Sequence, residues 1–332
     1  MGANVPFDLW PPFQIHRTLN INDGDIDIPL SYLPRQYIDG SIRIGGKERC
    51  KIIYGTVTNR GGYGKIYKCK RISSDIQDVC VKVPHNPSFS LCSEGLLQWI
   101  ASETLKGVGV QGAIPEIYDI FQYAGETRIA MSYIKGVSSI DYILNSSTPE
   151  ITFVQVVVQV CLILGYLEEK IYLDHRDLKA DNLWIRNSPV SYSVSCGGKV
   201  WTLSAPFQVV VLDFGFGCLG LLDGNSVVSL SDGILPKFDP CPKEGRDVFQ
   251  LFVSLWSFSS IRNKMSSTFQ AEIDILLSYK NKPYTSLIKE SIDTRWVYLL
   301  VSDPVFKYPP LSPLSLLHAY SIKYDSLYIS SE

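Results

Sequence analysis

Two short stretches of the chain hold the residue types that phosphate chemistry needs. Residues 174–185 read DHRDLKADNLWI and residues 211–217 read VLDFGFG, and each lies just before or within strand-like sequence. Carboxylate and amide oxygens are the hard ligands that phosphate-bound Mg²⁺ prefers, and phosphoryl transfer also needs a carboxylate that orients the attacking hydroxyl. A surface turn, a hairpin corner or a helix cap would explain each motif alone, but coincidence does not explain all of them in this order and spacing.

The order H-R-D-L-K-x-x-N followed by D-F-G resembles the catalytic loop and the metal-binding turn of the eukaryotic-type protein kinases. The resemblance runs from about Lys51 to Trp256. It implies that Asp177 accepts the proton of the substrate hydroxyl and that Lys179 lies near the transferred γ-phosphoryl group of ATP. It also implies that Asn182 and Asp213 bind the metal, Mg²⁺ or Mn²⁺.

The same family places a lysine on a strand of the N-lobe and pairs it with a glutamate on the next helix. Lys82 lies in the apolar run VCVKV, where an unpaired charge is costly to bury. The following helix offers Glu94 and Glu103, which face opposite sides because each residue turns the helix by about 100°. We favour Glu103, which shares its side with Leu96 and Trp99; Glu94 is the alternative, otherwise a solvated acid at the helix start.

Residues 59–67, NRGGYGKIY, resemble the phosphate loop of the kinases, with asparagine in place of the first glycine. Asparagine tolerates a left-handed backbone better than other non-glycine residues, so we expect Asn59 to replace that glycine. The expected nucleotide contacts of this loop are Asn59, Gly61, Gly62, Tyr63 and Gly64.

The stretch RIAMSYIKG resembles the strand and hinge between the two kinase lobes. Met131 would lie behind the adenine, in the position known as the gatekeeper. The backbone from Ser132 to Ile134 would offer the adenine its hydrogen bonds. An ordinary edge strand with a core methionine is the competing interpretation.

The elements that must position these residues form an α+β, bilobal arrangement. Residues 51–134 consist of short β-type segments with one helical segment, SEGLLQWIASETLK, and predict a β-rich N-lobe. Residues 135–332 are richer in helical patterns and predict an α-rich C-lobe. Residues 1–50 are rich in loops and read as an N-terminal extension packed on the kinase domain.

Several features depart from the family pattern. An insertion at residues 188–206 has two β-patterned runs around Cys196-Gly197-Gly198, which predicts a hairpin that touches a partner or only packs on the core. No A-P-E triplet follows D-F-G; the nearest candidate is Ile234-Leu235-Pro236. Asp247 resembles the buried aspartate that ties down the catalytic loop. The C-lobe is abbreviated, as in kinases of large DNA viruses.

The composition excludes some partners. The chain has 31 basic and 33 acidic residues and a net charge of -2, so it shows no overall electrostatic footprint for nucleic acid or anionic membrane. Its most apolar stretch, residues 151–167, contains Gln155 and Gln159 and predicts a buried helix rather than a membrane span. The eight cysteines have no zinc-type spacing, which favours a reducing, intracellular compartment: the cytoplasm, of a host cell if the protein is viral.

The leading functional hypothesis is an ATP-dependent serine/threonine protein kinase that phosphorylates a protein substrate. The lysine in HRDLK is similar to serine/threonine rather than tyrosine kinases. A nucleotide-binding pseudokinase scaffold is the first alternative, although every catalytic position is filled. A small-molecule kinase of the aminoglycoside-phosphotransferase type is the second. The sequence does not specify the oligomeric state.

Overall fold

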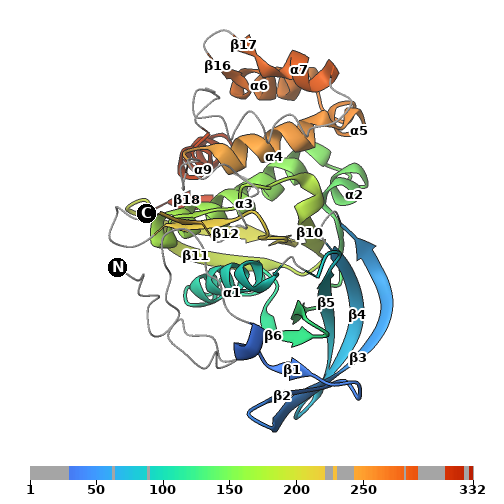
Figure 1. Cartoon of the computed structure of the whole chain (residues 1–332). Helices are drawn as coiled ribbons and strands as arrows, with labels where there is room; N and C mark the ends of the chain where they lie inside the picture. Colours follow the sequence, from blue (N-terminus) through green and yellow to red (C-terminus); the bar gives the residue numbers. More distant parts are fainter. Residues whose placement is uncertain are drawn as a thin grey trace.

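The chain folds into a strand-rich N-lobe and a helical C-lobe, as the α+β, bilobal prediction expected (Figure 1). The computed structural model describes residues 30–61, 64–87, 90–220, 227–229, 243–279, 282–290, 311–324 and 329–331. In Figure 1 the N-lobe strands lie at the bottom and the C-lobe helices above them, with helix α1 between the two groups.

The N-lobe is a closed barrel with the strand order β1-β2-β3-β4-β5-β7-β6. The parallel pair Arg35 and Gln122 joins β1 to β6 and closes it. The predicted domain boundary at residue 51 therefore needs correction, because the residues before it supply β1, β2 and the first part of β3. The strands are β1 (Arg35–Gln36), β2 (Ser41–Ile44), β3 (Lys47–Arg60), β4 (Gly64–Ile72), β5 (Ile76–Pro84), β6 (Ile117–Tyr123) and β7 (Glu126–Ser132).

Helix α1 (Cys92–Lys106) packs against both lobes. Its residues from Cys92 to Ser102 are all buried, on every side of the helix. On the barrel side, a side chain at Gly95 would meet Ile120 at 2.8 Å, so glycine allows the helix to approach the strands closely. Burial therefore does not single out one inward face of α1.

The C-lobe is built around helix α3, whose aromatic neighbours come from α4 and α6. Phe153 of α3 contacts Phe252, Trp256 and Phe269 at ring-centroid distances of 6.0, 6.2 and 5.6 Å. Helix α3 is the one helix of the described part that is long and apolar enough to cross a membrane, and 83% of its most apolar window is buried. The C-lobe helices are α2 (Ser139–Leu144), α3 (Pro149–Ile171), α4 (Arg246–Ser257), α5 (Ser259–Arg262), α6 (Ser267–Leu276), α7 (Tyr284–Glu290) and α9 (Pro313–Lys323).

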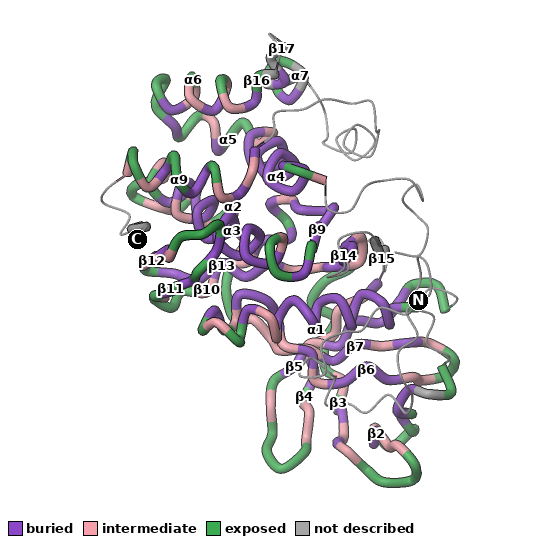
Figure 2. Tube along the Cα trace, turned by 90° about the vertical axis from the view of Figure 1, so that its left-hand side faces the viewer, coloured by how far each residue is buried: buried purple, intermediate pink, exposed green. Residues whose placement is uncertain are grey.

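The insertion forms a hairpin of β11 (Val190–Cys196) and β12 (Lys199–Ala205), and β12 also pairs with β18 (Ile329–Ser331). Gly197 and Gly198 have φ of 62° and 72°, which suits the tight hairpin turn that their sequence predicts. Alternate side chains of both strands are buried in the main core, including Trp201. The hairpin is thus part of the C-lobe core, and the tube in Figure 2 shows its buried segments beside those of α3.

Four short strands frame the two motifs. The catalytic loop lies between β9 (Leu173–Asp174) and β10 (Leu183–Arg186), and D-F-G lies between β13 (Gln208–Val211) and β14 (Cys218–Gly220). Strand β10 pairs with β13 and with β8 (Val137–Ser138), and β9 pairs with β14. Six of the described cysteines are free thiols, whereas Cys218 is disulfide-bonded, a pairing that the spacing of the cysteines does not predict.

Gly136, in the link between the lobes, has no room for a side chain. A Cβ atom at Gly136 would overlap the carbonyl oxygen of Ile185 in β10. We expect Gly136→Ala to push β8 away from β10 and to cost about 1–3 kcal/mol of unfolding free energy. Gly107→Ala is the control, because Gly107 is helical and its nearest neighbour would be 3.5 Å away. Calorimetry should show a lower Tm for the first variant only, and equal Tm values would contradict this explanation.

Candidate active site

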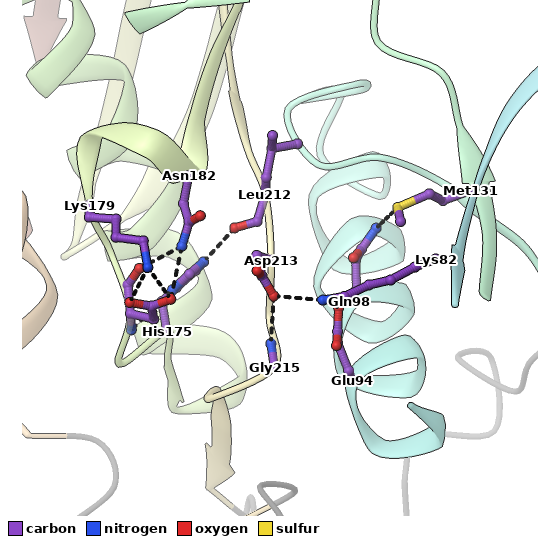
Figure 3. A network of polar contacts seen from close by, with 11 residues as sticks. Lys82, Glu94, Gln98, Met131, His175, Lys179, Asn182, Leu212, Asp213 and Gly215 are labelled. Carbon is purple, nitrogen blue, oxygen red and sulfur yellow. Dashed lines mark hydrogen bonds and ion pairs between the residues drawn. The ribbon is translucent and has the colours of Figure 1, made fainter. Parts of the chain in front are cut away.

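A buried ion-pair network joins the N-lobe to the D-F-G turn (Figure 3). Lys82 Nζ at the end of β5 lies 2.6 Å from Glu94 Oε1 and 3.0 Å from Asp213 Oδ1. The side chains of Lys82 and Glu94 are 8% and 5% exposed, whereas that of Asp213 is 41% exposed. One ammonium group thus connects strand β5, helix α1 and the segment that follows β13.

The prediction that Glu103 pairs with Lys82 is wrong. Glu94 occupies that position, and Glu103 lies 3.5 Å from Lys106 on a partly exposed side of the helix. The prediction assumed that the side of Leu96 is the inward one. Because α1 is buried on all sides through its first three turns, both sides are inward there, and Glu94 in the first turn is nearer to the end of β5.

The two carboxylates determine the charge state of the lysine. Burial by itself lowers the pKa of Lys82, but the adjacent carboxylates of Glu94 and Asp213 outweigh it and raise the pKa above its ordinary value. Partial burial raises the pKa of Asp213, but the Lys82 ammonium outweighs this effect and leaves the pKa below its ordinary value. The lysine is therefore positively charged and Asp213 negatively charged at neutral pH.

In the catalytic loop, two of the predicted residues contact the carboxylate of a third. Lys179 Nζ donates hydrogen bonds to both oxygens of Asp177, at 3.0 and 2.9 Å. Asn182 Nδ2 donates to the backbone oxygen of Asp177 at 2.8 Å and to its Oδ2 at 3.2 Å. The amide nitrogen of Asn182 is thus engaged within the loop, which leaves its amide oxygen as the atom suited to a metal.

His175 connects the catalytic loop to D-F-G. Its Nε2 lies 3.0 Å from the carbonyl oxygen of Leu212, and because a carbonyl only accepts, Nε2 carries the proton. Its Nδ1 then accepts a long hydrogen bond, 3.4 Å, from the backbone N–H of Asp177. Burial lowers the pKa of His175, which favours this neutral form. The ring also packs on Phe214, with a centroid distance of 4.8 Å.

Helix α4 holds the catalytic loop through three polar side chains on one face. Asp247 accepts hydrogen bonds from the backbone N–H groups of His175 and Arg176, at 2.6 and 2.8 Å, in agreement with the resemblance. Gln250 donates to the backbone oxygen of Arg176, and Ser254 accepts from the backbone N–H of residue 180. Gln250 and Ser254 were not predicted from the sequence, although polar residues at i, i+3 and i+7 of an apolar helix indicate a polar face of this kind.

Two residues of the site have left-handed backbone conformations that non-glycine residues rarely adopt. Arg176 and Asp213 each have a φ of 63°. Such conformations persist when surrounding contacts enforce them, and they occur often at functional sites. Here the contacts are those of Asp247 with the Arg176 backbone and of Lys82 with the Asp213 carboxylate.

The glycine loop lies between β3 and β4, and one of its described residues differs from the prediction. Asn59 lies in β3, paired with Ile66, and is not among the described non-glycine residues with positive φ, so it does not replace a left-handed glycine. Gly64 needs to be glycine, because a Cβ there would lie 2.6 Å from the carbonyl oxygen of Val83. The N–H of Gly61 donates to Gly64 O at 3.0 Å, and Gly62 and Tyr63 lie outside the described residues.

The hinge keeps its predicted place after β7, with one change. The backbone N–H of Ser132 donates to Glu116 O at 2.9 Å and is therefore not available to an adenine, which leaves residues 133 and 134 as the candidates. Met131 is half-buried, and its sulfur lies 3.6 Å from Gln98 Nε2 of α1. Gln98 is buried, and its contact with Met131 was not predicted from the sequence.

The donor set fits a metal that is shared with phosphate groups. Within the ranges that the structure describes, no group of three or more His, Cys, Asp or Glu side chains is arranged to hold a metal. Asn182 and Asp213 alone offer two hard oxygen ligands, and Mg²⁺ typically combines one or two protein ligands with waters and substrate phosphates. The two residues therefore suit an ion that arrives with a nucleotide.

The lysine pair can be tested by matched glutamine substitutions. Glu94→Gln leaves the buried Lys82 with Asp213 alone, and breaking a buried pair typically costs about 3–5 kcal/mol of unfolding free energy. Glu103→Gln removes a partly exposed pair and should cost below about 1 kcal/mol. The raised pKa of Lys82 keeps the first effect fully present at neutral pH. Urea unfolding at pH 7 measures both, and equal losses would contradict the assignment of Glu94.

The comparison with family models agrees with this geometry. The model of the protein tyrosine and serine/threonine kinases matches residues 52–216. No curated protein matches the chain. The matched residues span the glycine loop, both ion pairs of Lys82, the catalytic loop and D-F-G, so the chain belongs to the eukaryotic-type protein kinase family.

Proposed function

We propose that this protein is an ATP-dependent serine/threonine protein kinase, which transfers the γ-phosphoryl group of ATP to a hydroxyl group of a protein substrate. The observation that carries the proposal is the double ion pair of Lys82 with Glu94 and Asp213. It brings together groups from β5, α1 and D-F-G, which phosphoryl transfer needs in one place because its catalysis is mostly positioning and charge neutralisation.

In this proposal the nucleotide lies between the lobes. The adenine contacts the hinge next to Met131, and the phosphates lie near Lys82 and the turn at Gly64, where the absence of a side chain allows close approach. The ammonium group of Lys82 neutralises phosphate charge, and Glu94 orients that ammonium group toward the phosphates. Asn182 and Asp213 would hold the metal, which when bound neutralises charge on the phosphates.

The catalytic loop supplies the groups that act on the acceptor. Asp177 orients the hydroxyl and accepts its proton, so that the oxygen attacks the γ-phosphorus as the bond to ADP breaks. Lys179 already contacts both oxygens of Asp177 and lies where it can stabilise charge on the transferred group. A lysine at this position supports serine or threonine as the acceptor, because the HRDLK form resembles that of serine/threonine kinases.

The proposal predicts a sharp difference between two aspartates of one loop. Asp177→Asn should lower kcat by about 10²–10⁴-fold with little change in ATP affinity, because this group acts on the nucleophile. Asp181→Asn is the matched control, since Asp181 is exposed four residues further on. The assay combines the protein with Mg²⁺, γ-labelled ATP and a generic protein substrate, followed by identification of the labelled amino acid.

The assay also separates the alternatives. Label on serine or threonine that disappears in Asp177→Asn and in Asp213→Ala supports the proposal. Nucleotide binding without transfer by the wild type would identify a pseudokinase, and label found only on small alcohols or amines would identify a small-molecule kinase. A loss of ATP affinity in Asp177→Asn would overturn the role given to that residue.

A further inference from the structure

A second buried carboxyl group, Asp174, lies directly before the catalytic loop. Its side chain is 5% exposed, and its Oδ2 lies 3.2 Å from Nε of Arg246, which is 1% exposed. The same Oδ2 accepts a hydrogen bond from the backbone N–H of Lys243 at 2.9 Å. Another buried carboxyl group, that of Asp247, lies next to this cluster. No step of the proposed reaction uses Asp174.

The contacts of Asp174 reach both flanks of the segment between D-F-G and α4. On one side, Asp174 in β9 pairs with Cys218 in β14, where this segment begins. On the other side, its carboxyl group holds Lys243 and Arg246, where the segment ends and α4 starts. One residue therefore contacts the beginning of the segment through its backbone and the end through its side chain.

We propose that Asp174 is a positioning residue that anchors the C-terminal end of this segment to the catalytic loop, through Lys243, Arg246 and Asp247. The family usually closes the segment with A-P-E, which this sequence lacks, and the candidate at residues 234–236 lies outside the described residues. The anchor acts on catalysis through Asp247, which binds the backbone of His175 and Arg176. Its kinetic effect rests on the proposed kinase activity.

Two adjacent buried carboxyl groups are costly to ionise together, which favours a proton shared between them. Burial, and then the adjacent carboxylate of Asp247, raise the pKa of Asp174 well above its ordinary value. With one proton, the Asp174 and Asp247 pair carries a single negative charge, which the buried guanidinium of Arg246 balances. The other acidic groups near the pair are Glu168 of α3, whose pKa burial raises to about 7, and Glu244 beside it.

The shared proton gives the anchor a defined pH dependence. Because the folded protein binds this proton more tightly than the unfolded chain, stability falls as the pH rises above the ordinary value of 3.8 toward the raised pKa of Asp174. An asparagine at this position does not titrate, and its side-chain oxygen still accepts from the backbone N–H of Lys243. The stability advantage of the wild type over Asp174→Asn should therefore shrink with increasing pH.

The experiment compares Asp174→Asn, Asp174→Ala and the control Asp78→Asn in the full chain. Asp78 forms an exposed pair with Lys70 at 2.6 Å, and its pKa is lowered, so its removal has the opposite pH dependence. In Asp174→Ala, hydrogen exchange of the Lys243 amide should accelerate about tenfold or more, because its acceptor is gone. In Asp174→Asn it should stay within about threefold of the wild type.

Urea unfolding between pH 5 and 8 and steady-state kinetics complete the test. The difference in unfolding free energy between the wild type and Asp174→Asn should decrease as the pH rises. The corresponding difference for Asp78→Asn should not decrease. In Asp174→Ala, kcat should fall about tenfold or more with KM for ATP nearly unchanged, since misplacing the loop affects chemistry rather than nucleotide binding.

If hydrogen exchange of the Lys243 amide is unchanged in Asp174→Ala, the proposed anchor is wrong. If the difference in unfolding free energy between the wild type and Asp174→Asn does not depend on pH, the proposed shared proton is wrong. If Asp174→Ala does not fold, Asp174→Asn decides: an accelerated Lys243 amide in that variant would contradict the proposed hydrogen bonds. If the wild type transfers no phosphate, the proposed function fails, but exchange and unfolding still decide the role of Asp174.

Discussion

A single ammonium group, buried between two carboxylates, connects the lobes of this kinase. Lys82 would be costly to bury alone, and Glu94 and Asp213 repay that cost because they lie within 3.0 Å of it. The arrangement fixes three elements at once: the end of β5, the first turn of α1 and the turn after β13. The closed barrel and the buried faces of α1 act as the rigid frame of this contact.

The catalytic loop, the second half of the site, is held in place by helix α4. Asp247 of helix α4 accepts a hydrogen bond from the backbone of the catalytic loop. His175 of that loop is hydrogen-bonded to the carbonyl oxygen of Leu212. Asp213 follows Leu212 directly, so the chain of contacts runs from α4 through the loop to the lysine. The two left-handed residues, Arg176 and Asp213, lie along this route, where hydrogen bonds and an ion pair enforce their conformations.

The sequence predicts best the residues whose roles depend on local order. Asp177, Lys179 and Asn182 lie within six residues of each other, and their contacts follow from one loop conformation. The choice between Glu94 and Glu103 failed because it depends on which side of a helix meets which lobe. That information lies in the tertiary packing of a helix that is buried all round, and helical periodicity does not carry it.

Other features also cannot be predicted from sequence patterns, because they too depend on tertiary contacts. Strands β1 and β2 are too short to show alternation, yet β1 pairs with β6 and β2 pairs with β1, which places both in the barrel. The position of Asn59 in the glycine loop predicts a left-handed backbone, but Asn59 pairs with Ile66 as part of strand β3. Asp174 belongs to no recognised motif, although it directly precedes one. Only the structure shows its hydrogen bond with Lys243 and its ion pair with Arg246.

The central claim is that Lys82 and Glu94 act as one unit in nucleotide chemistry. A double-mutant cycle of Lys82→Met and Glu94→Gln, read as kcat/KM for ATP, measures their coupling directly. If Glu94 acts only by aiming the lysine, the double variant should be no slower than Lys82→Met alone. Independent, multiplying losses would show that the glutamate works by another route and would contradict this account of the site.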